Sequence, residues 1–227
     1  MRGLFVTGTD TGVGKTVVAG AVVAAVRARG ERVAAYKPVV TGLDEPVEPG
    51  WPRDHELLAA AAGVPAGAVT PHTFGPAVSP HLAAELAGVE LDVDAMVVAA
   101  SAAVAEAGAD VLVAEGVGGL LVPLTRDHTV RDLAVALGLP LLVAARPGLG
   151  TISHTLLTLE AARAAGLQVA AVVMTPWPES SDAMTRSNRA TVARIGGVDV
   201  AALPRLPDGH PPSLAAGGAA LPIGDWL

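Results

Sequence analysis

The sequence has no cysteine, few aromatic residues and no excess of basic charge. The absence of cysteine excludes disulfide bonds, thiolate catalysis and cysteine-ligated metal sites. A formal net charge of −7 at pH 7 argues against nucleic acid as the main partner. No basic stretch followed by a long apolar segment opens the chain, and the apolar run at 17–30 is too short for a bilayer. We therefore expect a cytoplasmic protein with neither nucleic acid nor a membrane as its partner.

Short apolar runs that alternate with helical segments are abundant. Hydrophobic residues make up 51% of the 227 residues. Continuous apolar strands separated by helices are typical of βαβ units, which form a parallel sheet covered on both faces. We predict a single α/β domain over residues 1–227, with a mostly parallel sheet and helices on both of its faces. The expected strands are 3–8, 32–39, 109–116, 140–146, 168–175 and 198–204, and the expected helices are 16–29, 55–63, 79–88, 92–108, 129–138, 151–166 and 180–197.

The segments between these elements give further expectations. Residues 43–54 carry three prolines and several acids, which predicts an irregular loop. Asp54 and Ser79 are placed to cap the helices that follow them. The Gly- and Pro-rich tail at 209–227 is expected to wrap the surface. Ligands of parallel sheets bind at the carboxyl ends of the strands, so we sought functional residues there.

The stretch FVTGTDTGVGKT near the start resembles a phosphate-binding loop with altered spacing. The usual pattern has four residues between its first glycine and Gly-Lys-[Ser/Thr]. Counting back from Gly14, that glycine would stand at Thr9, whereas Gly8 lies one residue too early. Strand, loop and helix nevertheless follow in the required order, which predicts a P-loop NTPase-like fold. Lys15 would then reach the β- and γ-phosphates, and the Thr16 hydroxyl would bind Mg²⁺.

Two acids and a second lysine follow other strands or loops. Glu115 stands at a strand end before several glycines, and Asp54 is delivered by the proline-rich loop. Two carboxylates with a hydroxyl suit a Mg²⁺ ion. Lys37 ends another strand, where it could neutralise charge on a transferring phosphoryl group. Each of these residues also has a purely structural explanation. Glu115 could be an acid with satisfied hydrogen bonds at a strand end, Asp54 a helix cap and Lys37 a solvated lysine.

The ordered set of motifs resembles dethiobiotin synthetase over about residues 4–206. The motifs are GTDTGVGKT, YKPVVTG, Asp54, SPH at 79–81, EGVGG at 115–119, LGTISHTLLTLEA and a late P-W-P segment. An extended phosphate loop is a trait of this family. The resemblance implies a ligase that forms dethiobiotin from 7,8-diaminopelargonic acid (7,8-diaminononanoate), CO₂ and ATP with Mg²⁺, in the penultimate step of biotin synthesis. One amine captures CO₂ as a carbamate, ATP phosphorylates it, and the second amine closes the ring and expels phosphate.

The resemblance also implies roles for individual residues. The implied catalytic residues are Lys37, Lys15 and Thr11, and the implied Mg²⁺ ligands are Thr16, Asp54 and Glu115. The implied nucleotide-binding residues are Gly12, Val13, Gly14, Lys15, Thr16, Val17, Asp54, Glu115, Gly116, Val117, Gly118, Thr175, Pro176, Pro204, Arg205 and Leu206. The implied substrate-binding residues are Thr41, Gly150, Thr151, Ile152 and Ser153, of which the last four would act from the neighbouring subunit of a homodimer.

Two positions depart from many members of the family. Ser153 replaces an asparagine, a minor change because the resemblance implies that backbone N–H groups of the helix start would bind the substrate carboxylate. Thr175 replaces an asparagine that reads adenine with two hydrogen bonds, whereas threonine offers one hydroxyl. We therefore expect weaker discrimination among nucleoside triphosphates than those relatives show.

Three other interpretations are compatible with a phosphate loop. A partition- or positioning-type switch ATPase would carry a lysine early in the loop, but positions 9–11 contain none. A cobyrinate-type amidating ligase would need a glutaminase domain with a cysteine nucleophile. A P-loop binding module without turnover would not need Lys37 together with paired carboxylates.

Overall fold

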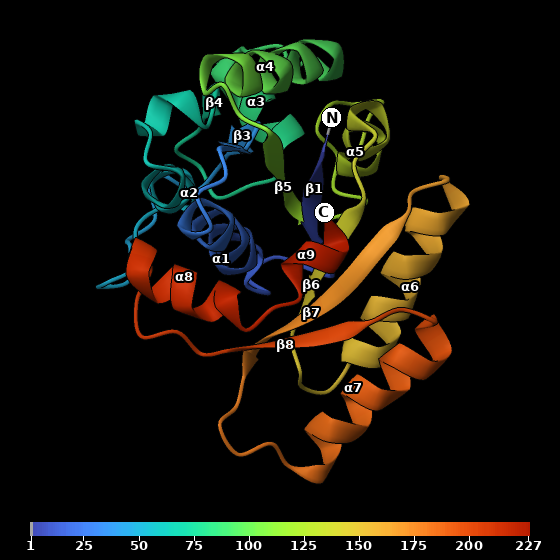
Figure 1. Ribbon diagram of the computed structural model, residues 1–227. Coiled ribbons are helices and arrows are strands. Elements are labelled where there is room, and N and C mark those ends of the chain that lie inside the picture. Colours follow the sequence, from blue (N-terminus) through green and yellow to red (C-terminus); the bar gives the residue numbers. More distant parts are fainter. Residues whose placement is uncertain (1) are drawn as a thin grey trace.

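The computed structural model describes residues 2–227 and contains a twisted sheet with helices on both faces (Figure 1). Six parallel strands lie in the order β2-β5-β1-β6-β7-β8, which confirms the predicted α/β fold. These strands are β1 (Arg2–Gly8), β2 (Val33–Tyr36), β5 (Val111–Gly119), β6 (Leu141–Ala145), β7 (Val169–Trp177) and β8 (Val200–Pro204).

The helices divide between the two faces of the sheet according to the core residues that they supply. One face is covered by α1 (Lys15–Ala28), α2 (Asp54–Ala62), α8 (Pro211–Ala219) and α9 (Ile223–Trp226). The other is covered by α3 (Pro80–Ala87), α4 (Val93–Glu106), α5 (Val130–Leu137), α6 (Thr151–Ala164) and α7 (Ala183–Gly196). A 3₁₀ turn, η1 (Ala66–Ala68), follows α2.

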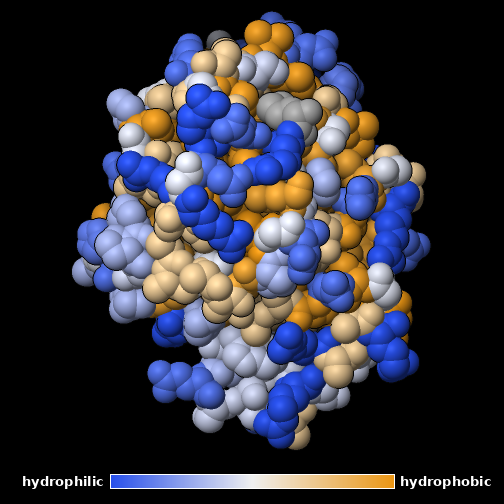
Figure 2. All heavy atoms as spheres, in the orientation of Figure 1, coloured by the Kyte–Doolittle hydropathy of each residue, from blue (hydrophilic) through white to orange (hydrophobic). Residues whose placement is uncertain are grey.

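Strand β1 shows why the strands read as continuous apolar runs. Leu4 and Val6 belong to the core on the α1 side, whereas Phe5 between them belongs to the core on the α4 side. Successive side chains of a strand point to opposite faces, so a strand buried on both faces needs an apolar residue at every position. Not all apolar side chains are buried: in Figure 2, apolar side chains reach the surface near the centre of the face in view and at parts of its edge, among hydrophilic ones.

The expected strand at 32–39 is wrong in its second half. Strand β2 ends at Tyr36, and the chain forms a separate two-stranded parallel sheet from β3 (Val39–Val40) and β4 (His72–Thr73). Pro38 explains the break, because proline has no N–H to donate to a ladder. Lys37 donates its N–H to the Val69 carbonyl instead, at 2.9 Å. The break turns the Lys37 side chain out of the sheet and into the strand-end region.

The tail is also not the surface wrapping that we expected. Residues 211–226 form α8 and α9, and Leu214 and Ile223 are completely buried in the core on the α1 side. Small residues allow this packing: a Cβ on Gly218 would lie 2.1 Å from the Ala21 carbonyl oxygen. The composition of the tail therefore reflects close contact between helices.

Helix α2 begins differently from the prediction. Asp54 is its first helical residue, and the N-cap position belongs to Arg53, whose N–H donates to the Glu56 carboxylate at 3.0 Å. Asp54 makes no capping bond, and its carboxylate contacts the Lys37 ammonium instead. Ser79 occupies the N-cap position of α3, as expected. Within residues 2–227, no helix is long and apolar enough to cross a membrane.

Candidate active site

A cleft of about 590 Å³ opens at the carboxyl ends of the strands. It receives residues from the loop after β1, from the region after β2, from the start of α2 and from the ends of β5, β7 and β8. Its lining includes sixteen predicted residues, which are Thr11, Gly12, Gly14, Lys15, Thr16, Val17, Lys37, Thr41, Asp54, Val117, Gly118, Thr175, Pro176, Pro204, Arg205 and Leu206.

The loop between β1 and α1 has the geometry of a phosphate site. Gly12 and Gly14 adopt positive φ angles of 67° and 89°, which favour glycine. Lys15 opens α1 and donates to the Asp10 carbonyl at 2.9 Å. Burial lowers the pKa of the Lys15 ammonium, and the Glu115 carboxylate offsets only part of that effect. A helix start with a lysine and free N–H groups is suited to bind polyphosphate.

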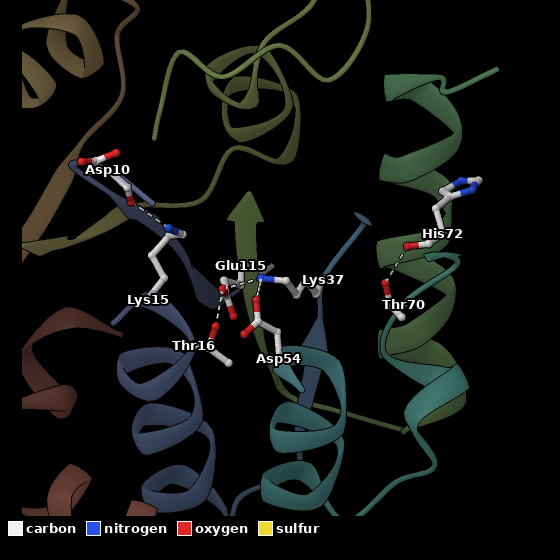
Figure 3. A network of polar contacts seen from close by, with 8 residues as sticks. All are labelled: Asp10, Lys15, Thr16, Lys37, Asp54, Thr70, His72 and Glu115. Carbon is white, nitrogen blue, oxygen red and sulfur yellow. Dashed lines mark hydrogen bonds and ion pairs between the residues drawn. The ribbon is translucent and has the colours of Figure 1, made fainter. Parts of the chain in front are cut away.

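Beside this loop, the side chains of Lys37, Asp54, Thr16 and Glu115 come from separate parts of the chain and form one cluster (Figure 3). The Lys37 ammonium lies 2.5 Å from Glu115 Oε1 and 2.9 Å from Asp54 Oδ2. The Thr16 hydroxyl donates to Glu115 Oε1 at 2.9 Å. Strands β2 and β5 are neighbours in the sheet, so their ends bring Lys37 and Glu115 together. The predicted lysine and the predicted carboxylates thus form one cluster.

Burial makes this cluster electrostatically unusual. The side chains of Lys37 and Glu115 are 2% and 1% exposed, whereas that of Asp54 is 50% exposed. Burial alone would lower the pKa of Lys37, but the carboxylates of Asp54 and Glu115 raise it above its ordinary value. Lys37 is therefore a fixed cation and not a solvated strand-end lysine. Burial raises the pKa of Glu115, and the Lys37 charge opposes this rise.

The cluster also offers oxygen ligands that fit a Mg²⁺ ion. Glu115 Oε2 is buried without a hydrogen-bond partner, although Oε1 of the same carboxylate accepts two bonds. A buried carboxylate oxygen without a partner is costly, and a bound cation would relieve that cost. Thr16 and Asp54 add a hydroxyl and a half-exposed carboxylate. No group of three His, Asp or Glu residues suited to a metal occurs among residues 2–227, so an ion here would also depend on oxygens of a bound phosphate.

The other end of the cleft is lined by Thr175, Pro176 and residues 204–206, which are apolar except for Thr175 and Arg205. Thr175 is 2% exposed, and a Cβ on Gly14 would lie 2.6 Å from its Cγ2 methyl group. Thr175 therefore packs directly on the phosphate loop. The pairing of Trp177 with Pro204 places the segments after Thr175 and before Leu206 side by side. These segments frame the space next to the expected phosphate position.

Some predicted residues do not line the cleft. Val13 is buried in the core, and Gly116 is packed so closely that a Cβ would meet Val130 at 2.7 Å. Glu115 lies beneath the cleft surface. The four residues at the start of α6 are also absent from the cleft of their own chain; these are Gly150, Thr151, Ile152 and Ser153.

Four residues of the lining were missed by the sequence analysis. Glu48, Trp51 and Pro52 belong to the irregular segment before α2, and Leu57 lies within that helix. The proline-rich composition of that segment predicted a loop but gave no direction for its side chains. The one available signal was the presence of an aromatic residue in a loop, in a chain that has few aromatic residues.

The fold and the loop at the start of α1 define a P-loop nucleoside-triphosphate-binding protein. Solved structures with this architecture include the MinC:MinD cell division protein complex of Aquifex aeolicus, at a TM-score of 0.58, 12% identity and coverage of 99% of this chain and 93% of that one. A ParA family ATPase from Chlorobium tepidum matches at a TM-score of 0.52, 11% identity and coverage of 98% and 92%. At such identities these similarities support the fold alone.

Sequence comparison identifies the family. A family model described as "AAA domain" matches residues 2–213. The "ATP-dependent dethiobiotin synthetase BioD" of Anaeromyxobacter dehalogenans is 49% identical over 197 residues, which are 86% of each chain. The protein of the same name from Novosphingobium aromaticivorans is 42% identical over 91% of this chain and 88% of that one. The chain belongs to the ATP-dependent dethiobiotin synthetase family, and the alternative of a partition-type switch ATPase is not favoured.

Proposed function

We propose that this protein closes the ureido ring of dethiobiotin from 7,8-diaminononanoate, CO₂ and ATP. The observation that carries the proposal is the buried Lys37–Glu115 pair, with Asp54 and Thr16, directly beside the phosphate-loop Lys15. Similarity to enzymes named ATP-dependent dethiobiotin synthetase supports the same reaction. The chemistry needs no covalent enzyme intermediate, so a chain without cysteine can perform it.

The reaction would proceed in three steps. One amine of the substrate adds to CO₂ and loses a proton to give a carbamate. A carbamate oxygen then attacks the γ-phosphorus of ATP, ADP leaves, and a carbamic–phosphoric anhydride forms. The second amine attacks the carbonyl carbon of this anhydride and loses a proton, phosphate leaves, and the five-membered ring is closed.

The charged side chains would act mainly on the phosphoryl transfer. Lys15 would contact the γ-phosphate, and Lys37 would stabilise the negative charge that develops between the carbamate and the leaving ADP. Lys37 is suited to this role because its ammonium is buried and held by two carboxylates. Thr11 lines the same cleft and would contact the carbamate, and Thr41 would contact the diamine end of the substrate.

We propose that Thr16, Asp54 and Glu115 hold Mg²⁺ together with phosphate oxygens. The buried oxygen of Glu115 without a partner supports this assignment. The ion would neutralise charge on the β- and γ-phosphates of the nucleotide. Val17 and the predicted residues at the ends of β5, β7 and β8 would hold the ribose and the base of the nucleotide.

We further propose a homodimer in which each active site is completed by its partner. The start of α6 has a glycine N-cap, Gly150, and lies away from the cleft of its own chain. The Thr151 N–H donates to the Gly148 carbonyl at 3.3 Å, but the N–H groups of Ile152 and Ser153 could bind the distal carboxylate of a substrate held in the other subunit. Leu149, just before this helix start, is 88% exposed, and Leu157 and Leu121, which line one hollow, are 61% and 53% exposed; association would cover such apolar side chains.

The proposal also covers the extent of the protein and its location. Both core clusters are built on the same six-stranded sheet, which supports one catalytic domain over residues 1–227. A reaction that consumes ATP supports a cytoplasmic location.

The test is phosphate release with ATP and Mg²⁺, with diaminononanoate and bicarbonate omitted in turn. We expect phosphate only when both are present, in a one-to-one ratio with dethiobiotin identified by mass spectrometry. Phosphate release that is independent of either substrate would contradict the proposal and would favour a switch ATPase. Binding of ADP, followed by calorimetry, checks separately that the preparation is folded.

A further inference from the structure

Nearly all aromatic side chains of this chain are packed in the core or against another side chain. The sequence has six: two Phe, three Trp and one Tyr. Four of them are buried in the core, which are Phe5, Tyr36, Phe74 and Trp226. Trp177 is partly buried, and its ring faces the Arg189 guanidinium at 5.6 Å. Trp51 is the remaining one, and it alone among them lines the active-site cleft.

The segment that carries Trp51 is held in place by backbone contacts. The Trp51 N–H donates to the Glu48 carbonyl at 3.0 Å, and the Gly50 carbonyl accepts from the Gly209 N–H at 3.1 Å. The second bond joins the loop before α2 to the segment after β8. Residues 205–206, which the family resemblance assigns to the base, lie at the start of that segment.

The ring itself is packed at the outer end of the cleft. A Cβ on Gly209 would lie 3.3 Å from Trp51 Cε3, 2.9 Å from Pro52 Cδ and 3.0 Å from Leu57 Cδ1. Gly209 therefore permits the loop to lie close against the segment after β8. The ring is half-buried against the core on the α1 side, and its remaining surface lines the cleft.

The two ends of the cleft differ in chemistry, which decides how a nucleotide must lie. The phosphates are directed to the end with Lys15 and Lys37, since that end holds the phosphate loop and the start of α1. A base attached to those phosphates must then lie away from the loop, towards the lining residues Trp51, Pro204, Arg205 and Leu206. A flat aromatic ring at that end presents a surface on which any nucleobase can stack.

We propose that Trp51 is a nucleobase-binding residue, which contacts the face of the base of the bound nucleoside triphosphate. This inference rests on the proposed function, because it takes the phosphate loop as the anchor of the nucleotide. Stacking reads the face of a base and not its hydrogen-bonding edge, so it contributes affinity with little preference for adenine. It accounts for a site in which Thr175 offers a single hydroxyl and a methyl group that faces Gly14.

Dissociation constants of ADP, CDP and pyrophosphate would test this role in the wild type, Trp51→Ala and Trp51→Phe. We expect Trp51→Ala to bind both nucleotides about tenfold more weakly, within the range of stacking on an aromatic ring. Its affinity for pyrophosphate should be unchanged, and Trp51→Phe should keep most of the nucleotide affinity. Val47→Ala is the matched control, because Val47 lies in the same loop, is 54% exposed and does not line the cleft.

Three results would overturn the proposal: unchanged nucleotide affinity in Trp51→Ala, an equal loss for pyrophosphate, or an equal loss in Val47→Ala. Fluorescence gives a second measurement that does not depend on the alanine variant folding. ADP should change the tryptophan emission of the wild type, and Trp51→Phe should remove that change; persistence of the change in Trp51→Phe would contradict the proposal. Failure of dethiobiotin synthesis with intact ADP binding would refute the proposed function and leave this test valid.

Discussion

The two ends of the cleft are built by different means. At the phosphate end, charged side chains from β5, α2 and the end of β2 and the Thr16 hydroxyl from α1 hold one another at 2.5–2.9 Å in a largely buried cluster. At the base end, proline, leucine and tryptophan side chains supply apolar surface, Thr175 supplies one hydroxyl and Arg205 supplies one charge. The difference indicates that the phosphate end is preorganised for chemistry, whereas the base end tolerates variation. Catalysis requires fixed charges in fixed places, but anchoring a base requires little more than a surface.

The strongest test of this difference is Lys37→Ala. Loss of one preorganised charge should raise the barrier by about 3–4 kcal/mol, a fall of several hundredfold in turnover. The affinity for ADP should change little, because the phosphate loop remains. Turnover and ADP dissociation constants are the measurements, with the circular dichroism spectrum as a control for folding. Retention of more than about a tenth of wild-type turnover would remove Lys37 from its assigned role.

In a shared active site, the distal carboxylate of the substrate would lie beyond the cleft and would bind the start of α6 of the partner subunit. Gly150→Pro should abolish activity, because proline cannot adopt the φ angle of 86° at this N-cap. Mixing it with Lys37→Ala should restore activity, since one site of the mixed dimer then has both intact components. Light scattering should give a mass of two chains. A mass near 22.6 kDa at assay concentration, or no restoration in confirmed mixed dimers, would contradict the shared site.

Asp54→Asn tests the ion at the phosphate end. The amide keeps the shape of the side chain but loses its charge, so we expect the Mg²⁺ concentration for half-maximal activity to rise about tenfold, equivalent to about 1.4 kcal/mol. Removing the metal with EDTA should stop the wild type, and added Mg²⁺ should restore it. Glu56→Gln is the matched control, because Glu56 lies in the same helical turn but bonds to Arg53. An equal shift in both variants would indicate a general effect of charge.

The smallest expected effect belongs to the base end. We expect the wild type to bind ATP more tightly than CTP and GTP by much less than a hundredfold. A hundredfold ratio of dissociation constants would correspond to about 2.7 kcal/mol. Thr175→Asn should shift the preference towards ATP by a few fold, because an amide can pair with two groups of the adenine edge. Competition binding of the three nucleotides measures both quantities. A strong ATP preference in the wild type, or no shift of the nucleotide preference in the variant, would contradict this prediction.

The parts of the molecule differ in how far the sequence predicts them. The strands of the main sheet and the phosphate loop were predictable, because their signals are local: unbroken apolar runs and glycines beside a lysine. Lys37 was identified at a strand end, but its contact with Asp54 depends on the start of α2, which a capping preference misassigned. The contribution of Trp51 was not predictable, since the direction of a loop side chain depends on a distant contact, here the bond between Gly50 and Gly209.

The burial of α8 beside α1 has a consequence for how the protein is made. Helix α1 is synthesised before α2 to α8, so one part of its cover, which includes Leu214 and Gly218, is made long after it. The newly made chain must therefore keep the side of α1 that packs on α8 uncovered until α8 has been made. Folding of this face can finish only once α8 has left the ribosome, and until then α1 is an expected site for chaperone binding.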